Sequence, residues 1–148
     1  MPIVKSSEAK EGGFGQVREA LVAFEADVVA QDARGSKTEF GKWGSVEGKP
    51  PREFLQIVTK NAKPTEVTEE LSMDIAEGFS FRVNCSDYKG SFWVDMFLPS
   101  AEKLGILVPE GLIGKRLGFR RFTLEAKNKD GSPNPQFNST SYIIEKIA

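Results

Sequence analysis

The sequence predicts a mainly β protein with five antiparallel strands, a short helix between the third and fourth strands, and an amphipathic helix near the N-terminus. Two observations favour this fold class. The segment Phe79–Cys85 alternates apolar and polar residues as a half-buried strand does, and further extended runs recur along the chain after residue 50. One short helical segment, opened by Pro99 and Ser100, separates two of these runs.

The N-terminal third is predicted to lie outside the β domain. Residues 1–15 are expected to form a flexible polar tail. Over residues 16–32, apolar residues recur at steps of four, three and four, which predicts one face of an amphipathic helix. This face consists of Val17, Leu21, Phe24 and Val28.

A glycine-rich connector over residues 34–51 follows the helix and ends in two prolines. It contains Phe40 and Trp43, which a flexible connector does not need, so we expect them to pack on the domain or to form a short edge strand. The predicted organisation is therefore a tail over 1–15, a helix and connector over 16–50, and a β domain over 51–148.

The β domain is expected to begin with one long bent strand, or two short ones, over Arg52–Val58 and Thr65–Thr68. Phe79–Cys85 and Phe92–Leu98 are predicted to form the next two strands. They are joined by a hairpin loop in which Gly90 supplies the positive φ that such a loop needs.

The second half of the β domain contains the helix and the last two strands. Ser100 is the expected N-cap of a short helix over residues 101–107. The fourth and fifth strands are predicted over Gly114–Glu125 and Ser141–Ile147, with a polar loop at 127–138 between them.

This order of elements resembles the OB-fold, a small, partly open, five-stranded Greek-key barrel. The resemblance covers about residues 50–148 and depends on the strand–helix–strand step from Leu98 to Phe119. Another antiparallel barrel or a sandwich would also fit the pattern. The resemblance implies that the exposed face of strands two and three, with the neighbouring loops, binds oligonucleotides or oligosaccharides.

Aromatic and basic residues are interleaved on the predicted binding face. Trp93 and Phe97 would lie on the exposed side of strand three. Arg82 and Asn84 would lie beside them on strand two, with Tyr88 and Lys89 at the hairpin tip. Aromatic rings contribute about 1–3 kcal/mol per stacked base, and Lys and Arg follow the phosphates. These residue types in this pattern are typical of proteins that bind single-stranded nucleic acid.

The fourth predicted strand adds further candidates for nucleic-acid binding, which are Lys115, Arg116, Arg120, Arg121 and Phe122. If Leu117 and Phe119 point inward, strict alternation would also bury Arg121, so we expect a bulge near Arg120–Arg121 that turns both arginines outward. Residues 80–129 carry 9 Lys/Arg against 5 Asp/Glu, although the whole chain has a formal net charge of −1.

Each of these features also has a purely structural interpretation. Trp93 and Phe97 could instead pack under the N-terminal helix or the connector. The arginines could pair with acids on a solvated strand face, and Tyr88 and Lys89 could simply be exposed at a turn. Cys85 shares a strand face with phenylalanines and is expected to be a small buried apolar residue.

The composition excludes several classes of site. The chain has no histidine and one cysteine, which removes histidine-based nucleophilic catalysis, disulfide frameworks, and zinc sites built from histidine or several thiolates. We predict no catalytic residue, metal or cofactor; the acids Asp87 and Asp95 fit no recognisable catalytic scheme. The chain lacks a membrane-spanning apolar run of about 20 residues and a secretory signal, so we expect a cytoplasmic, intracellular protein without membrane contacts.

We therefore expect a non-catalytic protein that binds single-stranded nucleic acid, with DNA favoured over RNA, by aromatic stacking and a local basic groove of low sequence specificity. The alternative is a protein-interaction subunit of a replication or repair assembly, whose aromatic face meets a partner. In either case the N-terminal helix could mediate homo-oligomerisation or contact with a partner protein.

Overall fold

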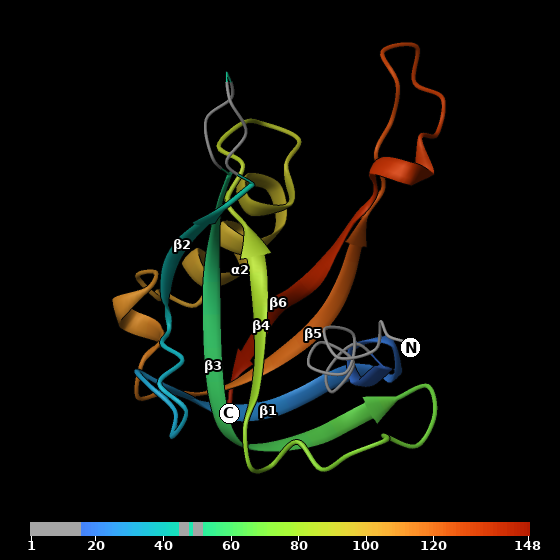
Figure 1. The fold of residues 1–148 in the computed structure, drawn as a ribbon. Coiled ribbons are helices and arrows are strands. Elements are labelled where there is room, and N and C mark those ends of the chain that lie inside the picture. The colour runs from blue at the N-terminus through green and yellow to red at the C-terminus, as the bar shows by residue number, and fades with distance from the viewer. Residues whose placement is uncertain (1–15, 45–47, 49–51) are drawn as a thin grey trace.

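The computed structural model describes residues 16–44, 48 and 52–148. They form a mainly β structure, an antiparallel sheet of six strands with one short helix between the fourth and fifth strands (Figure 1). The strands are β1 Leu21–Val29, β2 Glu39–Trp43, β3 Arg52–Val67, β4 Phe79–Asn84, β5 Arg116–Leu124 and β6 Ser139–Ile147. The helical elements are the π-helix η1 Trp93–Phe97, the α-helix α2 Leu98–Lys103, and the 3-10 turns η2 Glu110–Leu112 and η3 Pro135–Phe137.

The long strand β3 organises the sheet. Its first part pairs with β2 on one side and β4 on the other, and its second part pairs with β1. Asn61, in the second part, has a φ of 55°, a left-handed conformation that asparagine tolerates better than most residues, and the register with β1 shifts opposite this region. The prediction of a long bent strand is confirmed.

The sheet curls but is not closed into a barrel. Its order is β2-β3-β1-β5-β6, with β4 on the other side of β3. The curling brings β4 and β6 into contact, and the Ser141 hydroxyl donates to the Arg82 carbonyl oxygen at 2.9 Å. Among the described residues no backbone ladder joins these two strands. The mainly β prediction and the strands now numbered β4, β5 and β6 are confirmed.

The predicted N-terminal helix is wrong beyond its first turn. Residues 16–20 are helical, but the chain then becomes β1, which lies between β3 and β5 in the sheet. Phe24, Ala26 and Val28 alternate inward as strand residues do. Register shifts around Ala23 place Leu21 and Phe24 both in the core, three residues apart. This irregularity imitates the helical spacing, and it brings residues 21–29 into the β domain.

The connector contains the expected edge strand. Phe40 and Trp43 belong to β2, which pairs only with β3 among the described strands. Phe40 also contacts Trp93, with ring centroids 6.1 Å apart and an interplanar angle of 76°. The predicted tail over residues 1–15 and the connector residues 45–47 and 49–51 lie outside the described residues.

The predicted strand over Phe92–Leu98 is also wrong, because this segment is helical. The Val94 amide donates to the Ser91 hydroxyl, which starts the helical segment. Pro99 has no N–H to donate, and the turn before it is widened so that the Leu98 amide bonds the Trp93 carbonyl. Ser100 lies inside α2 instead of capping a helix, and its hydroxyl links the Phe97 carbonyl to the Ile144 amide.

The core is an aromatic cluster enclosed by the curled sheet. Its central rings are in edge-to-face, stacked or tilted contact at centroid separations of 5.1–6.3 Å. They belong to Phe24, Phe79, Phe81, Phe119 and Tyr142. The Tyr142 hydroxyl donates to the Leu21 carbonyl at 2.8 Å, and burial raises the pKa of this phenol to about 12. Within the described part of the chain, no helix has the length and apolar character needed to span a membrane.

Candidate nucleic-acid interface

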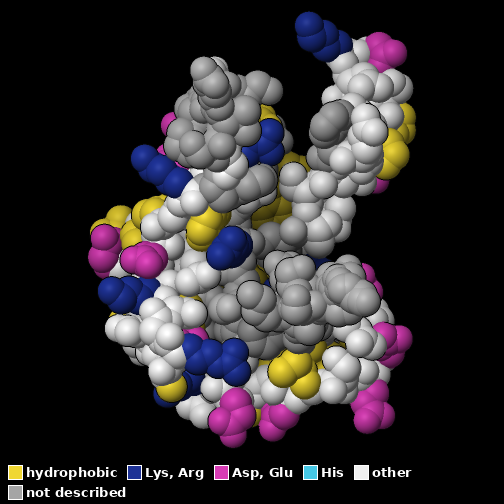
Figure 2. Space-filling model, in the orientation of Figure 1, with side chains coloured by type: hydrophobic (Ala, Val, Ile, Leu, Met, Phe, Trp, Pro, Cys, Tyr) yellow, Lys and Arg dark blue, Asp and Glu magenta, His cyan; other side chains and the backbone are white. Residues whose placement is uncertain are grey.

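A groove of about 760 Å³ lies between the ends of β3 and β4 on one side and the base of the β5–β6 hairpin on the other. Figure 2 shows the hollow between the body of the protein and the projecting hairpin. The lining comes from four chain segments. Its residues are Arg52, Glu53, Arg82, Asn84, Ser86, Tyr88, Gly90, Ser91, Phe92, Leu124, Glu125, Ala126, Asn138, Ser139, Thr140 and Ser141. We call this feature the β4–arm groove.

The arm, residues 125–138, is the connection between β5 and β6 that projects from the sheet (Figure 1). It is held by its own polar side chains. The Ala126 amide donates to the Asn138 side chain at 2.8 Å, and Asn128 bonds both Ser132 and Asn134 at 3.0 Å. The predicted polar loop at this position is therefore ordered by internal hydrogen bonds, and its base forms one wall of the groove.

The opposite wall contains Arg82 and the loop that follows β4. Arg82 points outward from β4, because Phe81 and Val83 on either side of it are buried in the core. Its guanidinium lies over the Phe54 ring, 4.3 Å from the ring centroid, in a cation–π contact. Its side chain makes no ion pair or side-chain hydrogen bond within the described part of the chain, and the residue lines the groove.

Tyr88 is the exposed aromatic residue of this wall, with 64% of its surface accessible. The loop that presents it is fixed by Ser91, whose amide bonds the Tyr88 carbonyl at 3.1 Å and whose hydroxyl donates to the Ser86 carbonyl at 2.6 Å. Lys89 follows Tyr88 and is exposed. Tyr88 and Arg82 are thus brought to one groove, as the sequence predicted, but by a loop and not by a two-strand hairpin.

The charge of the groove is mixed. Its lining includes Arg52 and Arg82 but also Glu53 and Glu125, and the arm carries Lys127 and Lys129 next to Asp130. Uncharged donors and acceptors outnumber the charges, because four serines, a threonine and two asparagines line the same space. The groove therefore offers many hydrogen-bonding groups and little net charge.

The arginines of β5 are engaged elsewhere. Arg116 bonds Asp27 at 3.2 Å, and Arg120 bridges Glu66 at 2.9 Å and Glu145 at 3.2 Å. These contacts lower the pKa of the Asp27 carboxyl, mainly through hydrogen bonds from Asn61 and Arg116, and raise that of Arg120. The solvated, acid-paired interpretation holds for both residues.

Arg121 contradicts the expected bulge. It pairs across the sheet with the buried Tyr142 and so follows strict alternation onto the inner face. Its guanidinium donates to the carbonyls of Arg18 and Glu19 at the end of the helical turn, at 2.5 and 2.6 Å, so it is not left unpaired. The register irregularity of β5 lies earlier, between Gly118 and Phe119.

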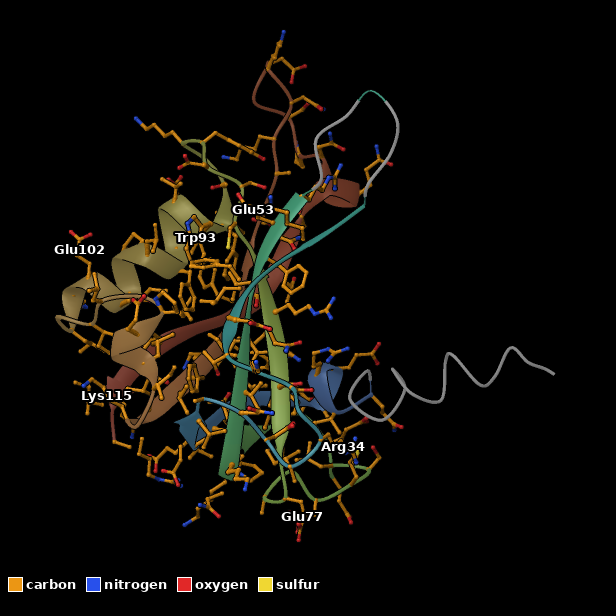
Figure 3. All side chains as sticks on the ribbon, turned by 60° about the vertical axis from the view of Figure 1, so that its left-hand side comes forward. Arg34, Glu53, Glu77, Trp93, Glu102 and Lys115 are labelled. Carbon is orange, nitrogen blue, oxygen red and sulfur yellow. The ribbon has the colours of Figure 1, made fainter. Side chains whose placement is uncertain are left out.

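The two remaining β5 candidates do not line the groove. Lys115 precedes β5 and is partly exposed, on the side of the molecule away from Glu53 in Figure 3. Phe122 is 38% exposed and lies opposite Ser141, which does line the groove. Phe122 therefore borders the site, whereas the three arginines of its strand do not line the groove.

Trp93 and Phe97 are buried, not exposed as the strand prediction required. Their accessible fractions are 8% and 0%, and their rings stack at 5.2 Å with an interplanar angle of 7°. In Figure 3 Trp93 lies where the helical segment packs on the sheet. Packing against the connector, the alternative interpretation of these rings, is the observed one, because Phe40 covers Trp93.

Sequence reasoning placed Asn84 beside Arg82 on the outward side of β4, where the structure has it. It missed the polar residues on the opposite wall of the groove. No local sequence pattern identifies the other wall, because only the fold places the base of the arm opposite β4. The residues concerned are Asn138, Ser139 and Thr140.

The acidic residues and the cysteine are the groups on which metal binding or nucleophilic chemistry would depend. The described residues contain no group of three or more His, Cys, Asp or Glu side chains that could hold a metal ion. Asp87 and Asp95 are both exposed, one in the loop and one in η1. Cys85 is partly buried, and desolvation raises the pKa of its thiol to about 12, which makes it a poor nucleophile.

Comparison with known proteins gives no family assignment. A scan against protein-family models found no match, and searches of curated proteins and of solved structures found none either.

Proposed function

We propose that this protein is a non-catalytic binding protein for single-stranded nucleic acid and that the ligand occupies the β4–arm groove. The observation that carries the proposal is the convergence of exposed Tyr88, unpaired Arg82 and a polar wall on one open groove. Bases offer flat apolar faces and polar edges, and phosphates accept hydrogen bonds from arginine and amide groups. The groove provides a counterpart for each of these.

The architecture supports the same proposal through its likeness to an OB-fold. When the edge strand β2 is left out, five strands remain, with the helix between the third and fourth. In that assignment β3 and β4 are strands two and three, and the arm is the loop between strands four and five. These are the regions with which OB-folds bind oligonucleotides, and the groove lies between them.

The mixed charge sets the expected salt dependence. Two arginines line the groove, and each phosphate contact to a single strand contributes about 0.7 to the slope of log affinity against log salt. We therefore expect a shallow slope, no steeper than about −1.4, a value reached only if both arginines contact phosphate. Stacking and hydrogen bonds, not bulk charge, should supply most of the affinity.

The test is an anisotropy titration of a labelled oligothymidine of about 12 nucleotides at two salt concentrations. An oligouridine of equal length, titrated alongside, tests the expected preference for DNA. Tyr88→Ala should weaken binding roughly 5-fold to 150-fold, as loss of one stacked base predicts. Phe40→Ala, which removes an exposed ring outside the groove lining, is the matched control and should leave binding unchanged. If the unmodified protein does not bind oligothymidine at low salt, the proposal is wrong.

A protein-interaction module is the second candidate. The observation that favours it is the exposure of Leu107 and Ile113, at 73% and 38%, on either side of η2. Exposed apolar side chains of this kind are frequent at protein interfaces. Light scattering of the purified protein tests its self-association, and a Leu107→Ser, Ile113→Ser double variant should dissociate any oligomer formed through this surface.

A further inference from the structure

The Arg82 side chain is supported in a way that a simple phosphate contact does not require. The central carbon of its guanidinium lies over the Phe54 ring, 4.3 Å from the ring centroid. The three arginines of β5 contact carboxylates or carbonyl oxygens, whereas the Arg82 guanidinium contacts an aromatic ring. Stacking on a ring fixes the plane of the guanidinium and not merely the position of its charge.

Gly41 provides the space for this arrangement. Gly41 and Phe54 are direct cross-strand partners in β2 and β3, and a Cβ atom on Gly41 would lie 2.6 Å from the Phe54 Cζ atom. The absence of a side chain lets the Phe54 ring lie down against β2, where it is 8% exposed although it belongs to the outer face of the sheet. Gly41, Phe54 and Arg82 therefore form three successive layers across β2, β3 and β4.

The backbone under Arg82 is fixed as well. The Arg82 carbonyl accepts the hydrogen bond from Ser141 of β6, and Arg82 pairs with Gln56 of β3 in the sheet. The main chain of Arg82 is held by β3 and β6, and its guanidinium rests over the Phe54 ring, before any ligand arrives. Such preorganisation reduces the ordering cost of binding.

We propose that the Gly41–Phe54–Arg82 layers form a stacking platform, on which the outer face of the Arg82 guanidinium receives a nucleobase. This proposal rests on the proposed function and names the part of the ligand that meets Arg82. Arginine guanidinium planes stack on bases much as aromatic rings do. The platform replaces the exposed tryptophan that the sequence suggested, since Trp93 is buried.

The chemistry of Arg and Lys separates a platform from a phosphate contact. Lysine keeps the positive charge but has no plane, so Arg82→Lys preserves a phosphate contact and destroys a stacking surface. Arg82→Gln removes the charge too. Two further variants disturb the support under Arg82 without changing any charge. Phe54→Leu removes the ring, and Gly41→Ala displaces it, because the Phe54 ring must move to admit the new methyl group.

The experiment measures affinity and salt slope for these variants with two ligands, oligothymidine and an abasic oligomer carrying the same number of phosphates. On oligothymidine, Arg82→Lys should bind roughly threefold to tenfold more weakly than the unmodified protein, with an unchanged salt slope. On the abasic oligomer the two proteins should bind equally. Phe54→Leu and Gly41→Ala should weaken oligothymidine binding in the same way, with circular dichroism confirming that both are folded.

The control is Arg34→Lys, because Arg34 is an exposed arginine at the opposite end of the sheet from Glu53 (Figure 3). This variant should have the same affinity and salt slope as the unmodified protein for both ligands. One outcome would overturn the platform: Arg82→Lys binds oligothymidine as well as the unmodified protein, while Arg82→Gln loses affinity and about 0.7 of the salt slope. Arg82 would then contact phosphate, and the proposed function would still stand. If the unmodified protein binds neither ligand, both proposals fail.

Discussion

Replacing Phe97 by alanine tests the placement of the aromatic residues that the sequence misassigned. Phe97 has no accessible surface, and its ring is stacked on Trp93 at 5.2 Å beneath the helical segment. The substitution removes most of a buried ring from a site enclosed on all sides. Its effect should therefore appear in stability and not directly in ligand binding.

The magnitude follows from the burial and the ring contact. Truncating a buried phenylalanine to alanine costs about 3–5 kcal/mol, of which the aromatic pair with Trp93 accounts for about 0.5–1.5 kcal/mol. Phe97→Leu keeps most of the apolar volume and loses the ring pair, so its cost should be about 1–1.5 kcal/mol. Comparing the decreases in the free energy of unfolding of the two variants separates the cost of the cavity from the cost of the lost ring contact.

Urea denaturation followed by tryptophan fluorescence and circular dichroism measures both losses. Phe97→Leu, which stays folded, should bind oligothymidine like the unmodified protein. The opposite pattern would refute the reasoning: a stability change of Phe97→Ala within about 0.5 kcal/mol, as for surface sites, together with weakened oligonucleotide binding. That result would place Phe97 on an exposed strand.

Three further predictions concern groups outside the groove. Arg121→Met should cost about 1–3 kcal/mol in urea denaturation, because two helical carbonyls lose their donor; a stability equal to that of the unmodified protein would contradict this role. Burial raises the pKa of Tyr142 to about 12 from 10.0, so stability should be full below pH 10.0 and decline as the pH rises toward 12; Tyr142→Phe should lose this component of the pH dependence. The Cys85 thiol, whose pKa is raised to about 12, should react much more slowly with iodoacetamide at about pH 8 in the native protein than in urea, and equal rates would argue against its burial.

The sequence predicts the β domain well where its local pattern and its final environment agree. Phe79–Asn84 alternates cleanly because one face meets the core and the other meets solvent. Two segments mislead for identifiable reasons. In β1 a register shift places Leu21 and Phe24 in the core at a helical spacing. In the Phe92–Leu98 segment, Trp93 and Phe97 are four residues apart because they stack on successive turns of a helix.

The candidate site is predicted less completely than the fold. Arg82 and Tyr88 are found from the sequence because outward alternation and a loop position are local properties. The β5 arginines look identical in sequence, but their acidic partners come from β1, β3 and β6, and Glu66 is 54 residues away from Arg120. Which arginine is left unpaired depends on long-range pairing, and no local pattern reports it.

The lack of a ladder between β4 and β6 has a mechanical consequence. A row of backbone hydrogen bonds resists sliding and widening, whereas the described residues span this seam with a single hydroxyl-to-carbonyl bond, from Ser141 to Arg82. The two walls of the groove belong to opposite sides of the seam. Apart from this bond, the seam is held by side-chain packing, with the Phe79 and Phe81 rings of β4 against Tyr142 of β6. A ligand that bound both walls would add a further connection between strands that share no backbone ladder.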